Sequence, residues 1–182
     1  MEHLTMTIDD FERVADSLGS CELVNGQVIP KLPGGYYHSR SAMKIGTILG
    51  NHCERAKCGR VIGCEAGVVT EPRSGTVRGA DVLYISYIRL AKGAQFPGFL
   101  RAVPELIVEV LGVSDSWKKI EEKVAEYHML GVDLVWVADP QTRSVRIYPK
   151  GGTPILKSDR ETIDGGHVLP KFKCKIARFF ED

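Results

Sequence analysis

The sequence predicts an α/β protein in which a mixed β-sheet is flanked by helices. Segments with helical periodicity are interleaved with short runs of β-branched and aromatic residues, an order that favours helices layered on a sheet. One of these runs, residues 104–111, is almost entirely apolar, as expected for a strand buried on both faces. The 182 residues are 43% hydrophobic and 26% charged, which is typical of globular domains. No repeat, low-complexity tract or linker divides them, so we expect one domain over residues 1–182.

The N-terminal part of the chain predicts a helix followed by a β-hairpin. Residues 7–10 carry a helix-capping signal, Thr followed three positions later by Asp, and Gly19 fits the end of the helix. Asn25-Gly26 lies between two apolar runs, and this pair favours a two-residue hairpin turn because both turn positions need positive φ. We therefore expect the hairpin over residues 21–30.

Two longer helices are predicted further along the chain. Residues 38–57 have apolar residues at mostly helical spacing, and the length of the segment favours a helix over a strand. Residues 114–131 form the most regular helical pattern of the sequence. Ser114 or Asp115 is suited to cap its start, and Gly131 fits the position after its end.

Strand-type runs lie between and after these helices. They occupy residues 61–69, 80–86, 104–111, 132–139 and 144–149. Pro140 opens a turn between the last two runs, so we expect them to pair as a hairpin. In the C-terminal segment, Lys171, Lys173 and Lys175 alternate with apolar residues, which indicates a strand with one basic face. This face is most simply solvated, and it also suits contact with phosphates.

The charge balance argues against a histone-like or coat-like protein. The chain has 24 Lys and Arg residues against 23 Asp and Glu residues, a net charge of +1. A general electrostatic binder of nucleic acid is usually more basic. The near-neutral net charge is still compatible with an enzyme that holds nucleic acid in one local basic groove. In such an enzyme a cluster of carboxylates offsets the basic residues in the net charge.

The cysteines and the N-terminal segment indicate a cytoplasmic protein. Five scattered cysteines do not resemble a disulfide framework. The N-terminal residues lack the apolar stretch of a signal peptide, and no run is long enough to span a membrane, so we expect no membrane partner. The set His52, Cys53, Cys58 and Cys64 suggests zinc, but its spacings contain no CxxC pair. We interpret these cysteines as core residues.

Glu109 is the most informative residue, because it lies inside the apolar run LIVEVL. A buried ionised carboxylate is costly unless a metal, a cation or a proton compensates its charge. The alternative is structural, since alternation puts Glu105, Ile107 and Glu109 on one strand face that can be partly solvated. From the residues alone, both interpretations stay open.

Asp81 begins another strand-type run, directly after the turn-like residues 77–79. By itself it is equally compatible with a turn-capping role. Its interest comes from Glu109 on a further strand, because two carboxylates from neighbouring strands make a hard oxygen site that suits Mg²⁺.

Lys123 lies inside the apolar face of the helix predicted over residues 114–131. On a helical wheel it falls between Tyr127 and Leu130, whereas Lys118 falls on the outer face. Such a lysine can extend along the helix into solvent. It can also point at carboxylates beneath the helix, where its charge would orient a water molecule and offset phosphate charge. Both interpretations stay open.

Glu22 and His38 are weaker candidates. Glu22 precedes the hairpin turn, where a solvated strand residue is the simpler interpretation, and His38 opens the second helix, where it can cap the helix or reach into a cleft. We interpret the neighbouring Tyr36 and Tyr37 as core or lid packing. The sequence contains no GxxxxGK[ST], GxGxxG, HExxH or GxSxG motif, which argues against the enzyme classes that use them.

Seven segments of the chain, taken together, resemble a known family. They are Glu22–Gly26, His38, Arg78–Val82, Pro104–Leu111, Lys123 with Glu126-Tyr127, Gly131–Pro140 and Leu169–Phe172. In this order, over nearly the whole chain, they resemble the Uma family of restriction endonucleases, which belongs to the PD-(D/E)XK nuclease superfamily. The chain departs from the family pattern at Ala80, Gly112 and Lys171, where the family usually has Pro, Ser and Gly.

The resemblance implies a restriction-endonuclease-like core and a metal-dependent endonuclease that hydrolyses phosphodiester bonds of nucleic acid, with DNA favoured. Asp81 and Glu109 would match the two acidic residues of the family. They would hold Mg²⁺, or Mn²⁺ in its place, with the Val110 carbonyl as a further ligand.

The remaining candidates follow from the same resemblance. Lys123 would match the relocated lysine of the family, since Leu111 stands at the usual lysine position of the superfamily. Glu22 and His38 would line the same cleft. A second class of function stays open, a non-catalytic nucleic-acid-binding or protein-binding module on a nuclease-like fold, because fold does not fix function. A homodimer also stays open, because cutting two strands requires two sites.

Overall fold

The computed structural model describes residues 5–95, 97–113 and 115–181. Within these residues the chain forms three α-helices, ten β-strands and a C-terminal 3-10 turn. The helices are α1 (Ile8–Leu18), α2 (Tyr36–Ala56) and α3 (Trp117–Leu130), and the turn is η1 (Ile176–Phe179). The strands are β1 (Cys21–Val24), β2 (Gln27–Pro30), β3 (Gly59–Glu71), β4 (Thr76–Ser86), β5 (Leu106–Val110), β6 (Leu134–Asp139), β7 (Ser144–Pro149), β8 (Ile155–Ser158), β9 (Thr162–Gly165) and β10 (Leu169–Lys175).

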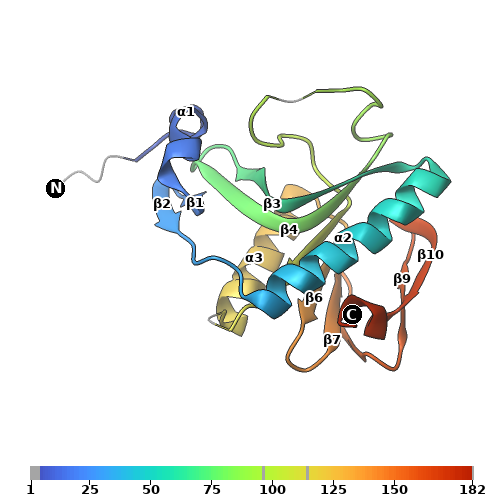
Figure 1. Cartoon of the computed structure of the whole chain (residues 1–182). Helices are drawn as coiled ribbons and strands as arrows, with labels where there is room; N and C mark the ends of the chain where they lie inside the picture. Colours follow the sequence, from blue (N-terminus) through green and yellow to red (C-terminus); the bar gives the residue numbers. More distant parts are fainter. Residues whose placement is uncertain (1–4, 96, 114, 182) are drawn as a thin grey trace.

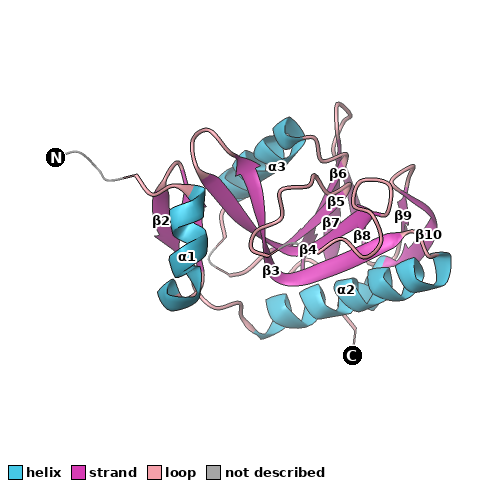
Figure 2. Ribbon diagram, turned by 90° about the horizontal axis from the view of Figure 1, so that it is seen from above, coloured by secondary structure: helices cyan, strands magenta, loops and turns pink. Residues whose placement is uncertain are grey.

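Eight of the described strands form one mixed sheet with the order β2-β1-β4-β5-β6-β7-β8, and β3 pairs with β4 beside this path. Only the β5–β6 pair is parallel among these pairs, and α3 connects these two strands as a crossover helix. Strands β9 and β10 form a separate two-stranded sheet. Figure 2 shows α2 and α3 on opposite sides of the large sheet, which confirms the expected mixed sheet flanked by helices.

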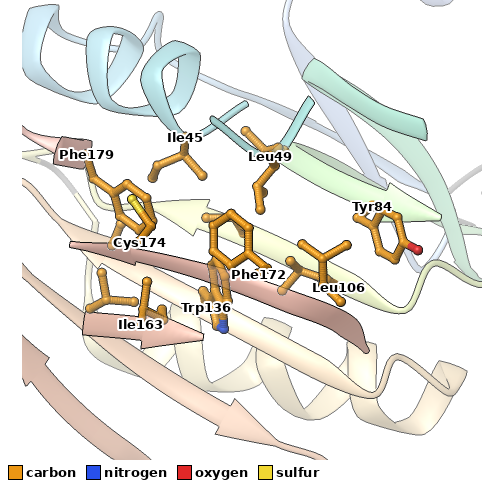
Figure 3. Close-up of a cluster of buried hydrophobic side chains, with 14 of the residues drawn as sticks. Ile45, Leu49, Tyr84, Leu106, Trp136, Ile163, Phe172, Cys174 and Phe179 are labelled. Carbon is orange, nitrogen blue, oxygen red and sulfur yellow. The ribbon is translucent and has the colours of Figure 1, made fainter. Parts of the chain in front are cut away.

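The hydrophobic core lies on both faces of the central strands. On one face, α2 and the C-terminal segment cover the sheet, and Figure 3 shows Ile45 and Leu49 of α2 pointing toward Phe172 and Trp136. Trp136 is completely buried in this cluster. On the other face, α3 packs Ile120, Val124 and Tyr127 against the sheet.

A smaller apolar cluster joins α1 to the β1–β2 hairpin. Phe11 of α1 stacks on Phe99 with 5.3 Å between the ring centroids, and Leu23 is completely buried below them. Figure 1 shows this N-terminal unit at one end of the molecule, with β9 and β10 at the other. The expected N-terminal helix and hairpin are both confirmed, including positive φ at Asn25 and Gly26.

The observed elements differ from the expected ones mainly at their ends. The side chain of Ser116 caps α3, not that of Asp115, and Ser114 lies outside the described residues. Helix α2 begins at Tyr36, before the expected start at residue 38. Strands β8 and β9 were not expected. None of the described helices is long and apolar enough to cross a membrane.

Candidate active site

Two neighbouring central strands bring Asp81 and Glu109 together. Strands β4 and β5 are antiparallel, and their register pairs Val82 with Val108. Continuing this register by one step places Asp81 opposite Glu109, so their side chains start from adjacent positions. Both residues are buried, with 5% of Asp81 and 4% of Glu109 exposed. Asp81 therefore lies within strand β4, not at the turn where its sequence context suggested a cap.

A β-bulge in strand β3 lies directly beside Asp81. The pairing of β3 with β4 shifts between Gly63 and Ala66, so that Cys64 and Glu65 together face one residue of β4. Cys64 and Glu65 adopt positive φ values of 63° and 58°, which non-glycine residues rarely adopt. Bulges of this kind are frequent next to active sites, where they redirect a side chain.

The Asp81 carboxylate is held by one backbone group and one imidazole. Its Oδ2 accepts a hydrogen bond from the backbone N–H of Val110 at 2.7 Å and lies 3.2 Å from Nε2 of His38. The hydrogen bond to Asp81 raises the pKa of His38, although burial of the imidazole opposes the rise. His38 comes from the first turn of α2, so the start of this helix reaches the Asp81 carboxylate.

The Glu109 carboxylate is held by two side chains of α3. Tyr127 donates its hydroxyl to Oε1 at 2.6 Å, and Nζ of Lys123 lies 3.2 Å from Oε2. Burial raises the pKa of Glu109, the charge of Asp81 adds to the rise, and Lys123 and Tyr127 only partly oppose it. Burial is therefore the main reason that the pKa of Glu109 is raised.

Lys123 bridges two carboxylates from different strands. Its Nζ lies 2.9 Å from Oε1 of Glu22 and 3.2 Å from Oε2 of Glu109. Burial alone would lower the pKa of Lys123, but the two carboxylates outweigh burial and raise it. Only 14% of this side chain is exposed, so it points into the carboxylate cluster and does not extend along the helix into solvent.

Glu22 joins the same cluster from strand β1. It contacts Lys123, and its Oε2 and Oε1 lie 3.0 Å from Arg78 and 3.6 Å from Lys31. Burial opposes ionisation, but the nearby cations lower the pKa of Glu22 to about 2. Arg78 also binds Glu126 of α3 at 2.7 Å, so the cluster ties β1 and β4 to α3.

The five side chains proposed from the sequence are connected in a row: His38 contacts Asp81, Asp81 lies opposite Glu109, and Lys123 bridges Glu109 and Glu22. Glu22, His38, Asp81, Glu109 and Lys123 come from β1, α2, β4, β5 and α3.

The sequence alone predicts no separate role for Tyr127 or Arg78. Tyr127 lies on the apolar face of its helix and is completely buried, yet its hydroxyl contacts Glu109. The available signal was its spacing, because Tyr127 lies four residues after Lys123 and therefore on the same helix face.

The donors at this site fit a hard divalent cation. Among the described residues, both polar contacts of the Asp81 carboxylate use Oδ2, which leaves Oδ1 to a further ligand. Burial raises the pKa of Glu109, and a bound cation would favour its ionised form. Two carboxylates and a neighbouring backbone carbonyl are the oxygen ligands that Mg²⁺ accepts together with water. Within the described ranges, no group of three or more His, Cys, Asp or Glu side chains is arranged to hold a metal ion. The same holds for the set of His52 with the cysteines.

The fold and this acid–lysine cluster together define a nuclease-like α/β protein. Residues 8–177 match the model of the Uma2 family, described as "Putative restriction endonuclease", and the chain belongs to this family. The structure is similar to the crystal structure of "a putative nuclease belonging to DUF820" from Anabaena variabilis, with a TM-score of 0.82. The two chains are 15% identical over 96% of this chain and 97% of the other, so the likeness establishes the fold. No curated protein matches the sequence.

Proposed function

We propose that this protein is a metal-dependent endonuclease that hydrolyses phosphodiester bonds of nucleic acid. The observation that carries the proposal is the pair of buried carboxylates, Asp81 and Glu109, at facing positions of adjacent strands, with Lys123 beside them. Nuclease chemistry needs concentrated negative ligands for a cation and a fixed positive charge near the phosphate. The description of the family as a restriction endonuclease favours DNA as the substrate.

Asp81, Glu109 and the Val110 carbonyl would hold Mg²⁺, or Mn²⁺ in its place. The bound cation would supply Lewis-acid polarisation of the phosphate and lower the pKa of a water molecule. The protein contributes the oxygen ligands and fixes them: the Val110 N–H and His38 orient Asp81, and Tyr127 orients Glu109.

Lys123 contributes the fixed positive charge. Its ammonium group stays protonated because Glu22 and Glu109 raise its pKa, and it lies within reach of the groups around Glu109. In this position it orients the attacking water and stabilises the negative charge that develops on the phosphate. Glu22 holds the ammonium from the other side, so it acts through Lys123 as a positioning residue.

The first test combines metal binding with DNA cleavage. Mg²⁺ and Mn²⁺ are titrated by calorimetry into the wild type, Asp81→Asn and Glu109→Gln, and nicking of supercoiled plasmid is measured on the same samples. Each substitution removes one charged metal ligand while keeping the shape of the side chain. We therefore expect metal affinity and nicking rate to fall by about 100-fold or more in both variants.

Glu105→Gln is the matched control. Glu105 is also buried, at 8% exposed, and lies just before β5, but its carboxylate bonds to the Ser86 backbone N–H at 2.9 Å, away from the cluster. This variant should bind metal and nick like the wild type. Undiminished nicking by Asp81→Asn and Glu109→Gln would reject the proposed site. Metal binding without cleavage of any nucleic acid would favour the non-catalytic binding module instead.

A further inference from the structure

A cavity of about 430 Å³ opens beside the proposed site, next to His38. Its walls come from the first turn of α2, the segment after β5, the turn between β6 and β7, and the C-terminal segment. Six of the lining residues carry the argument, Tyr36, Tyr37, His38, Val113, Gln141 and Arg143. The volume is within the range of small-molecule binding sites.

Two tyrosines at the mouth of this cavity are unusually exposed. Tyr36 is 70% exposed and Tyr37 is 68% exposed, so these residues do not pack into the core, and their packing as a lid stays a prediction. Their rings meet edge to face, with 5.3 Å between centroids and 80° between planes. Neighbouring exposed aromatic rings present flat apolar faces, and such surfaces commonly bind ligands.

The other walls combine apolar surface with fixed polar groups. Val113 is 90% exposed on the segment that follows β5. On the far wall, the guanidinium of Arg143 is fixed by Asp159 at 2.7 Å and lies over the ring of Phe180. Gln141 adds a side-chain amide that can donate and accept hydrogen bonds. Flat aromatic faces beside an amide that can donate and accept hydrogen bonds are features that recognise an unpaired nucleobase.

His38 connects this cavity to the carboxylate cluster. It lines the cavity, and its Nε2 lies 3.2 Å from Asp81. On another wall, Leu111 lines the cavity directly after Val110, whose N–H binds the same carboxylate. A nucleotide whose phosphate lies at Asp81 would therefore have its base next to the cavity.

We propose that this cavity binds one unpaired nucleobase of the substrate, stacked on Tyr36 or Tyr37, next to the phosphate that is cleaved. The inference rests on the proposed nuclease function and deepens it. A base inside an intact duplex is stacked on both faces and paired along one edge, so it has no free face to offer. The preferred substrate is therefore nucleic acid with an unpaired nucleotide at the cleavage position, such as a single strand, a flap or a mismatch.

The test measures stacking directly and does not require cleavage. Single-stranded DNA and RNA oligonucleotides carrying one 2-aminopurine, and their fully paired duplexes, are added to the wild-type protein in EDTA. We expect the fluorescence of the unpaired 2-aminopurine to be quenched on binding, and the duplexes to bind more weakly. Comparing the DNA strand with the RNA strand shows which of the two nucleic acids the cavity prefers.

Paired substitutions distinguish the aromatic rings from their hydroxyl groups. A variant with Tyr36→Leu and Tyr37→Leu removes both ring faces, whereas Tyr36→Phe with Tyr37→Phe keeps them. Loss of base stacking should weaken single-strand binding of the leucine variant by about 5-fold to 100-fold, with little change in the phenylalanine variant. Met43→Ala, an exposed residue of α2 outside the cavity lining, should bind like the wild type.

Several results would overturn the inference. Equal binding by the leucine variant and the wild type would show that the rings do not stack on a base. Equal loss in both double variants would assign the effect to the hydroxyl groups. A wild-type dimer that dissociates in the leucine variant, seen by sedimentation, would assign the tyrosines to contact between two copies. The nuclease proposal can fail independently of this inference. Plasmid nicking by Asp81→Asn tests the carboxylates, whereas the 2-aminopurine measurements test the cavity without any cleavage.

Discussion

At the scale of single residues, Glu22 shows how three cations hold a buried acid ionised. Lys123, Arg78 and Lys31 lie within 3.6 Å of its carboxylate, and their charges lower its pKa to about 2 from an ordinary value of 4.5. An acid with a lowered folded-state pKa stabilises the protein above its unfolded pKa. That stabilisation is lost as the pH falls from about 4.5 toward 2.

Glu22→Gln therefore predicts a pH-dependent difference in stability. The wild type should have a free energy of unfolding roughly 3 kcal/mol higher than the variant at pH 7, and the difference should shrink as the pH approaches 2. Urea unfolding of both proteins between pH 7 and pH 3 measures it. Carboxylates outside the cluster titrate alike in both proteins and cancel in the comparison, whereas Glu109, whose pKa the charge of Glu22 raises, contributes to the difference. A difference that stays constant over this range would show that the cations do not hold the Glu22 charge.

The sequence located the charged residues of the site but left their partners open. Lys123 had two interpretations, because a helical wheel gives the face of a residue but not what lies beneath it. The structure places Glu22 and Glu109 there. The helical pattern places Tyr127 on the apolar face of α3, where a purely structural core residue would also lie. Its hydrogen bond to Glu109 depends on how α3 packs on β5, which the helical pattern does not contain.

At the scale of secondary-structure elements, the bulge in β3 is the irregular feature next to the site, because it lies opposite Asp81 of β4. Cys64 is exposed and has φ near +63°, so its backbone conformation costs free energy that its side chain does not recover by burial. Glu65, the second bulge residue, lies 3.3 Å from Lys31, which in turn contacts Glu22. The bulge thus connects β3 to the charged cluster.

Substitutions at Cys64 test this connection. Cys64→Val should lower the free energy of unfolding by about 1–2 kcal/mol, because a β-branched residue tolerates positive φ poorly, whereas Cys64→Gly should be as stable as the wild type or slightly more stable. Nicking should fall in the valine variant as the bulge beside Asp81 shifts. Urea unfolding and the plasmid assay measure both effects. A valine variant with wild-type stability and activity would show that the bulge conformation is not required.

The elements with clear periodicity or turn signals were predicted, and the others were not. The Asn25-Gly26 hairpin and the lysine-bearing strand β10 both follow from alternation and turn residues. Strands β8 and β9 are four residues each, and β8 is largely exposed. Short, exposed strands show little alternation, so their pairing with neighbours decides their structure.

At the scale of the whole molecule, the apolar core and the charged cluster share the central strands and the two long helices, but the core extends beyond them. The cluster draws on β1, β4, β5 and the facing sides of α2 and α3. The largest apolar cluster extends the other way, to β10 and η1, which cover the sheet next to α2. Figure 1 shows these C-terminal elements at the end of the molecule opposite the N-terminal hairpin that carries Glu22.

This separation predicts a substitution that weakens the fold without changing the chemistry. Phe172 is 3% exposed and packs against Trp136 and His52, with ring centroids 5.9 Å and 5.3 Å away. Phe172→Ala leaves a cavity in the core and should lower the free energy of unfolding by about 3–5 kcal/mol. Leu156→Ala, on the exposed strand β8, should change it by less than about 0.5 kcal/mol.

Below the melting temperature of the weakened protein, metal affinity and nicking per folded molecule should equal those of the wild type, because the side chains that hold Asp81 and Glu109 come from other elements. Urea unfolding, calorimetric metal titration and plasmid nicking at low temperature measure the three quantities on one sample. A Phe172→Ala variant that is as stable as the wild type would contradict the assignment of the C-terminal segment to the core. A stable, folded variant with reduced metal affinity would instead show that the core under α2 positions His38 and, through it, Asp81.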